Sequence, residues 1–77
     1  MERAYLFVRA NDGKEKGVIE RLRDMPSVKK ANYIMCEVPW NIAVELEGSY
    51  EEICSTHWKV RDFNDISDSQ LNSVKVM

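Results

Sequence analysis

Leu22-Arg23-Asp24-Met25-Pro26-Ser27-Val28 is the stretch that decides the fold, because it returns 38 residues later as Val60-Arg61-Asp62-Phe63-Asn64-Asp65-Ile66. Each copy runs through an apolar residue, an arginine, an aspartate, a second apolar residue, two turn-forming residues and a third apolar residue. The repeat indicates that the 77 residues form two copies of one structural unit. This length is typical of a single small domain, for which association with other subunits is common.

The same offset aligns two segments that precede the repeated stretch. Their alternate residues are Ala4, Leu6, Val8 and Ala10 in the first segment and Ile42, Val44, Leu46 and Gly48 in the second. Side chains alternate between the two faces of a β-strand, so each set predicts a strand with one face turned toward the core.

Helices are expected between these strands and the strands that follow. Asp12 with Glu15 three residues later, and Ser49 with Glu52, have the spacing of a capping box at a helix start. The first helix has an apolar stripe of Val18, Ile19, Leu22 and Met25, and the second has a weaker one of Ile53, Thr56, His57, Val60 and Phe63. Further strands are predicted over 28–36 and 71–77. The order predicts an α+β fold, a ferredoxin-like βαββαβ sandwich with two helices on one sheet.

The face of the sheet that lacks helices is predicted to be unusually apolar. Its expected side chains include Tyr5, Phe7, Tyr33, Met35, Ala43, Leu71 and Met77. An apolar sheet face of this kind favours a subunit contact, so we predict a dimer interface. Its residues are Tyr5, Phe7, Tyr33, Met35 and Leu71. Two alternatives stay open: scattered surface hydrophobic residues, or a strand phase shifted by one residue, which would exchange the two faces.

Composition argues against several classes of function. The 11 basic and 13 acidic residues give a net charge of −2, and the sequence lacks the basic cluster that nucleic-acid binding requires. There is no signal-peptide pattern and no long apolar run, so we expect a cytoplasmic protein with no membrane contact. Cys36 and Cys54 match no metal or redox spacing, and we expect no cofactor.

Three segments, in their order along the chain, resemble a known family. They are Ala4-Tyr5-Leu6-Phe7-Val8, Met25-Pro26-Ser27-Val28 and Val38-Pro39-Trp40-Asn41-Ile42-Ala43-Val44. Together they resemble the RAM domain, the ligand-binding and oligomerisation domain of the leucine-responsive regulatory protein and AsnC family. The resemblance covers essentially the whole of 1–77 and implies a single stand-alone RAM-like domain, without the helix-turn-helix domain of the full regulators.

The resemblance implies how such a domain assembles and what it binds. Family members pack sheets face to face, an association of the dimeric α/β-barrel type, and join dimers into rings that bind a free amino acid between dimers. The corresponding ligand-binding residues here are Val38, Pro39, Trp40, Asn41 and Ser69. Val38 stands where the family has glycine, and Asn41 stands where it has aspartate, so we expect weak amino-acid binding.

The resulting hypothesis is a non-catalytic module that senses an amino-acid-type effector, forms a homodimer or a larger ring, and modulates transcription regulators of the same family. One alternative is a small dimeric α/β-barrel enzyme, similar to monooxygenases, that uses His57. A lone histidine without a cysteine, a paired carboxylate or a phosphate-binding loop is thin evidence for catalysis. Another alternative is a ligand-free structural partner that assembles with full-length family regulators.

Overall fold

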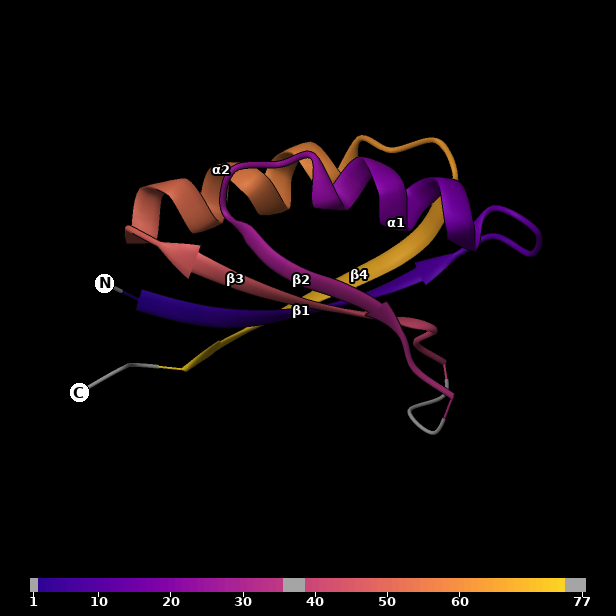
Figure 1. Cartoon of the computed structure of the whole chain (residues 1–77), viewed down its shortest axis with the longest axis horizontal. Coiled ribbons are helices and arrows are strands. Elements are labelled where there is room, and N and C mark those ends of the chain that lie inside the picture. The colour runs from indigo at the N-terminus through magenta and orange to yellow at the C-terminus, as the bar shows by residue number, and fades with distance from the viewer. Residues whose placement is uncertain (1, 36–38, 75–77) are drawn as a thin grey trace.

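The chain folds into four strands and two helices in the order expected for two β-α-β halves, as a computed structural model shows. The structure describes residues 2–35 and 39–74, with side chains up to Asn72. The strands are β1 (Glu2–Ala10), β2 (Val28–Tyr33), β3 (Ile42–Gly48) and β4 (Ile66–Val74), and the helices are α1 (Glu15–Arg23) and α2 (Tyr50–Arg61). Both helices lie on one face of the sheet (Figure 1). The predicted α+β ferredoxin-like sandwich is confirmed.

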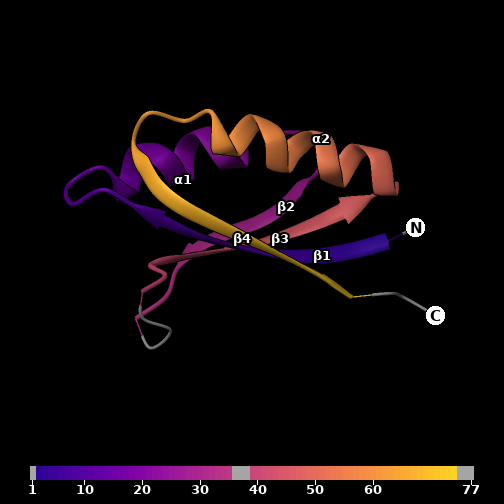
Figure 2. The same cartoon turned by 180° about the vertical axis from the view of Figure 1, so that it is seen from behind.

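The strands form one antiparallel sheet in the order β2-β3-β1-β4, so β2 and β4 are its edges. Helix α1 packs mainly against β2, and α2 packs against β4 and β3. The opposite face of the sheet carries no helix, as the view from behind also shows (Figure 2). Neither helix of the described chain is long and apolar enough to cross a bilayer.

The core forms where the two central strands and the helix stripes meet. The predicted inward residues of β1, together with Ile42, Val44 and Leu46 of β3, are buried. The helices add Val18, Ile19 and Leu22 from α1 and Ile53, Thr56 and Val60 from α2. The predicted inward residues of β1 and β3 are therefore confirmed except Gly48, and the stripe of α2 is confirmed at Ile53, Thr56 and Val60, whereas His57 is half-buried.

The starts of the two helices differ. Ser49 caps α2 as predicted: its hydroxyl accepts a hydrogen bond from the Glu52 amide at 3.2 Å, and the Glu52 carboxylate accepts one from the Ser49 amide at 2.9 Å. The prediction that Asp12 caps α1 is wrong. Gly13 has a φ of +83°, which is outside the helical region, so the helix cannot continue back to Asp12. The Lys14 amide donates to the Asn11 carbonyl and closes this turn. Lys14 is therefore the N-cap, and no side-chain hydrogen bond caps the helix.

Each edge strand contains a β-bulge. In β2 the extra residue is Lys29, because the register with β3 shifts between Val28 and Lys30. In β4 the extra residue is Ser67, because the register with β1 shifts in the same way. Lys29 and Ser67 are 38 residues apart, so both copies of the repeat carry the bulge at the same position. A bulge moves the side chains that follow it to the other face of the sheet.

The bulges overturn the predicted strand phase. Tyr33, which was expected on the outer face, pairs with the buried Ile42 and lies on the helix side, with 55% of its surface exposed. Leu71 was expected on the outer face as well, but it pairs with a buried residue of β1 and packs against the core. Met35 follows the end of β2 and is exposed. Met77 lies outside the described residues.

Candidate functional site

The predicted ligand-binding residues do not come together in one pocket. Val38 lies outside the described residues, and Trp40 is half-buried. Pro39 lines a groove with the bulge of β4, whereas Ser69 lines an adjoining groove between β4 and α2. The two grooves share Ser67 and Asp68.

Asn41 holds the end of β1 to the segment that leads into β3. Its side-chain oxygen accepts a hydrogen bond from the Ala10 amide at 2.8 Å, and its side-chain nitrogen donates to the Ala10 carbonyl at 3.0 Å. Its backbone amide donates to the Val8 carbonyl at 3.1 Å. Both ends of the Asn41 side chain are therefore engaged within the chain, where they continue the pairing of β1 in the manner of a strand residue.

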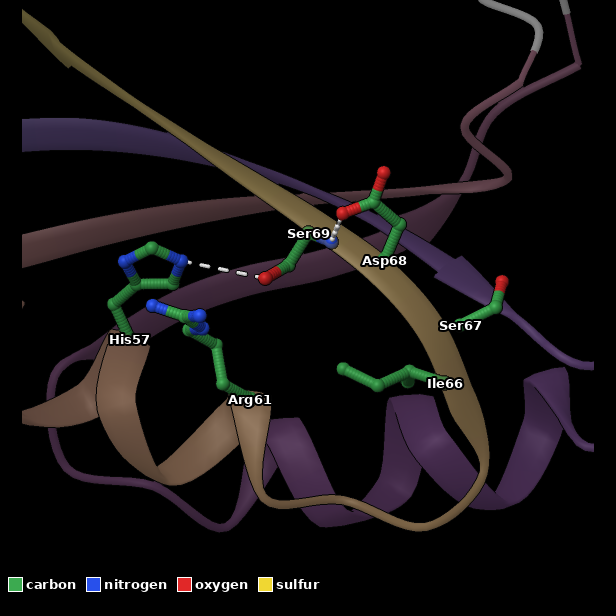
Figure 3. A pocket seen from close by; sticks show the side chains of 6 residues that line it. All are labelled: His57, Arg61, Ile66, Ser67, Asp68 and Ser69. Atoms are coloured by element: carbon green, nitrogen blue, oxygen red, sulfur yellow. Dashed lines mark hydrogen bonds between the residues drawn. The ribbon is translucent and has the colours of Figure 1, made fainter.

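A polar groove with a volume of about 460 Å³ lies between α2 and the edge strand β4. His57 and Arg61 point into it from one side of α2, and the Ser69 hydroxyl points toward them from β4 (Figure 3). The His57 Nε2 and the Ser69 Oγ are 3.3 Å apart. Asp68 borders the groove, but its side chain is on the outer face of β4. Its carboxylate accepts a hydrogen bond from the Ser69 amide at 2.8 Å.

The groove favours a neutral imidazole. Burial lowers the pKa of His57, and the positive charge of Arg61 lowers it further. The Arg61 guanidinium lies over the Trp58 ring at 4.9 Å from its centroid. Within the described residues, all ion pairs involve Arg3 or Lys29, so Arg61 has no carboxylate partner there. The groove therefore combines an uncompensated cation with two neutral hydrogen-bonding groups.

This arrangement suits anion binding better than nucleophilic catalysis. A serine activated by a histidine needs a third group that orients the imidazole. Among the described residues, the His57 imidazole has no hydrogen bond other than the one with Ser69, and Asp68 is turned to the other side of the strand. No three His, Cys, Asp or Glu side chains of the described chain are placed to hold a metal ion.

Sequence reasoning chose His57 and Ser69 for different reasons and missed Arg61. The repeat contained the missing signal, because Arg61 is the counterpart of Arg23. In the first half, Arg23 donates to the Ala31 carbonyl of β2 through Nε at 3.2 Å and Nη2 at 2.9 Å. In the second half the counterpart of Ala31 is Ser69, so the repeat pairs the second arginine with a hydroxyl-bearing residue.

The uncovered sheet face is a second candidate site, and it is less apolar than predicted. Tyr5, with 39% of its surface exposed, and the half-buried Phe7 and Ala43 form its centre. Around them lie the charged or polar residues Arg3, Lys29, Glu45, Glu47, Gln70 and Asn72. Lys29 and Arg3 lower the pKa of the Glu47 carboxyl by hydrogen bonding and charge, so this carboxylate stays ionised at neutral pH.

Comparison with known proteins places the fold. The chain is similar to the crystal structure of FFRP-DM1, with 25% identity and a TM-score of 0.85 over 96% of this chain and 99% of that one. It is also similar to the hypothetical protein PHS023 from Pyrococcus horikoshii, with 24% identity and a TM-score of 0.84 over 100% of this chain and 93% of that one. MtbAldR matches with 14% identity and a TM-score of 0.79, and the chain spans 51% of its length.

No family model matches the sequence, and no curated protein matches it. The evidence from known proteins is therefore structural. The matches with FFRP-DM1 and MtbAldR support a RAM-like fold of the Lrp and AsnC type for this chain.

Proposed function

We propose that the chain is a non-catalytic regulatory assembly domain that forms a homodimer and responds to a small amino-acid-type effector. The observation that carries the proposal is the match with FFRP-DM1 over nearly the full length of both chains. The bare sheet face supports it, because a sheet with helices on one side only has its other side available for a second subunit.

The dimer is expected to pack the two sheets face to face around Tyr5 and Phe7. Both rings are already partly covered, so each contributes on the order of 1 kcal/mol on further burial rather than the full value for a large side chain. On the same face Arg3 forms ion pairs with Glu45 and Glu47 at 3.5 Å, so the charges are largely compensated within each chain. A twofold contact, which brings the same patch of both subunits together, is compatible with this face. We therefore expect a dimer of moderate affinity, in the micromolar range.

Oligomeric state provides the test. In light scattering between about 1 and about 100 µM, the mass of the parent chain should rise from that of a monomer toward that of a dimer. Phe7→Glu should stay a monomer over this range, because it places a charge at the centre of the buried face. Tyr33→Glu is the matched control, since Tyr33 is exposed but lies on the helix side. A monomeric parent, or a Phe7→Glu variant that remains a dimer, would contradict the proposed interface.

Effector binding is proposed at the end of the sheet near Pro39 and Trp40, where backbone groups would contact the ligand. The Asn41 side chain is bound to Ala10, so it supports this segment and leaves recognition to neighbouring groups. Native mass spectrometry with a panel of free amino acids tests this part. Binding of none of them, with the dimer intact, would favour the other candidate, a ligand-free partner that assembles with full-length regulators.

A further inference from the structure

The two halves of the molecule carry equivalent grooves that have diverged. The groove in the first half is lined by Arg23, Val28, Lys29, Lys30, Ala31 and Asn32. The groove in the second half is lined by His57, Arg61, Ile66, Ser67, Asp68 and Ser69. Five of the six lining residues correspond across the 38-residue repeat, and the arginine is the same in both. The fold has thus built the same groove twice, once beside each edge strand.

In the first half the arginine of the groove is bonded within the chain. Arg23 donates two hydrogen bonds to the Ala31 carbonyl, and a third to the Asn32 side chain at 3.3 Å. Ala31 and Ile19, which faces the same region from α1, are both buried in the core. Here the guanidinium ties the edge strand to the helix, so its hydrogen-bonding capacity is used within the chain.

In the second half the same positions are polar. His57 is the repeat counterpart of Ile19, and Ser69 is the counterpart of Ala31. Arg61 makes no hydrogen bond with the described residues of β4 and lies over Trp58 instead. An apolar pair fills this position in the first half, whereas His57 and Ser69 form a hydrogen bond with each other at 3.3 Å in the second. The second groove therefore holds donors that the fold itself does not require.

We propose that the groove between α2 and β4 binds the oxyanion of a small molecule, a carboxylate or a phosphate, through the Arg61 guanidinium, the Ser69 hydroxyl and the His57 imidazole. Arginine offers planar, charge-assisted hydrogen bonds to such oxygens, and a hydroxyl and an imidazole N–H can complete the shell. The stacking of Arg61 on Trp58 restricts the guanidinium and leaves its N–H groups available. This site lies on the helix side of the sheet, away from the dimer face, and it adjoins the groove of Pro39, with which it shares Ser67 and Asp68.

Binding is expected to strengthen as the pH falls. An anion favours the protonated form of His57, which Arg61 disfavours in the empty groove. Asp68 is the other charged group that lines this groove, and its carboxylate is turned to the outer side of the strand. The complex should therefore take up a proton, with His57→Gln removing most of the pH dependence.

Titrations followed by NMR test the proposal on the full chain. Sulfate, which does not titrate near neutral pH, represents tetrahedral anions such as phosphate groups, and acetate represents carboxylates. Either probe should shift the amide signals of Ser69 and His57. The probe with the lower Kd identifies the ligand class. Arg61→Gln should weaken binding by at least about tenfold, the loss of one charge-assisted contact, and Ser69→Ala by less.

Arg21→Gln is the matched control. Arg21 is an exposed arginine over an aromatic ring, 4.2 Å from the centroid of Phe63, and it lies outside the groove. Its loss changes the net charge as Arg61→Gln does but should leave the affinity unchanged. Equal weakening by both variants would indicate nonspecific charge attraction and overturn the proposal. So would the absence of shifts at Ser69 and His57 with both probes. Neither result bears on the dimer, which light scattering of the same samples reports separately.

Discussion

Asn41 shows how one side chain can replace a stretch of strand pairing. Its amide group exchanges two hydrogen bonds with Ala10, as a backbone residue of an antiparallel strand would. Asn is suited to this role because one end of its side chain donates and the other accepts. The family resemblance assigns Asn41 to ligand recognition. In this structure Asn41 instead binds Ala10 at the end of β1.

Asn41→Asp should therefore destabilise the protein. The carboxylate keeps the acceptor for the Ala10 amide but loses the donor and places a negative charge against the Ala10 carbonyl. We expect the free energy of unfolding to fall by about 1 to 3 kcal/mol. Urea denaturation measures it, with Asn64→Asp as the control, because Asn64 is exposed in the turn after α2. An equal effect of the two variants would contradict this role of Asn41.

His57 should make stability depend on pH. Burial and Arg61 lower the pKa of His57 in the folded state, below the value of 6.5 that applies to an unperturbed histidine. Between these two pKa values the unfolded state binds more protons, so the free energy of unfolding should rise as the pH increases through this window and level off above it. His57→Gln should reduce this rise. Denaturation curves from about pH 5 to about pH 8 test the prediction. An unchanged pH dependence would show that other groups cause it.

At the scale of single elements, the start of α2 is better secured than the start of α1. The capping box satisfies amides at the first turn of α2, and its hydrogen bonds lower the pKa of the Glu52 carboxyl. Helix α1 begins after a glycine turn without a side-chain cap. It is held instead at its other end, where Arg23 bonds to the edge strand β2. The two halves thus stabilise equivalent helices at opposite ends.

Ser49→Ala should lower the free energy of unfolding by about 1 kcal/mol, because the Glu52 amide loses its acceptor and the reciprocal bond is weakened. Ser55→Ala is the control at an exposed position within the same helix, where alanine is a better helix former than serine. Thermal and urea denaturation of both variants provide the measurement. If Ser49→Ala were as stable as Ser55→Ala, the capping box would contribute nothing measurable.

At the scale of the whole molecule, the fold leaves two regions open for contact, and they lie on different sides. The uncovered sheet face has a small apolar centre and a mixed ring of charges, which fits a second copy of the chain. The groove beside β4 lies on the helix side and carries a cation with neutral donors, which fits a small anion. Because they are separate, assembly and anion binding can be tested independently by variants at Phe7 and Arg61.

Four features of the protein follow from the amino-acid sequence alone: the β-α-β repeat, the inward faces of β1 and β3, the helix stripes and the capping box at Ser49. These features depend on local periodicity and on short spacings, which a single chain displays directly. The prediction of a ferredoxin-like sandwich followed from them. The sequence also contained the counterparts of the groove residues, although their meaning depends on what each faces in the folded chain.

The phase of the edge strands and the set of residues that line the groove depend on the folded chain. A bulge depends on how one strand pairs with its neighbour. The residues around Lys29 and Ser67 therefore do not indicate that the side chains after them lie on the other face of the sheet. For this reason Tyr33 and Leu71 lie on the helix side of the sheet and not in the predicted interface. Likewise, Arg61 became a site residue because α2 and β4 bring it opposite Ser69, a contact that no spacing along the sequence specifies.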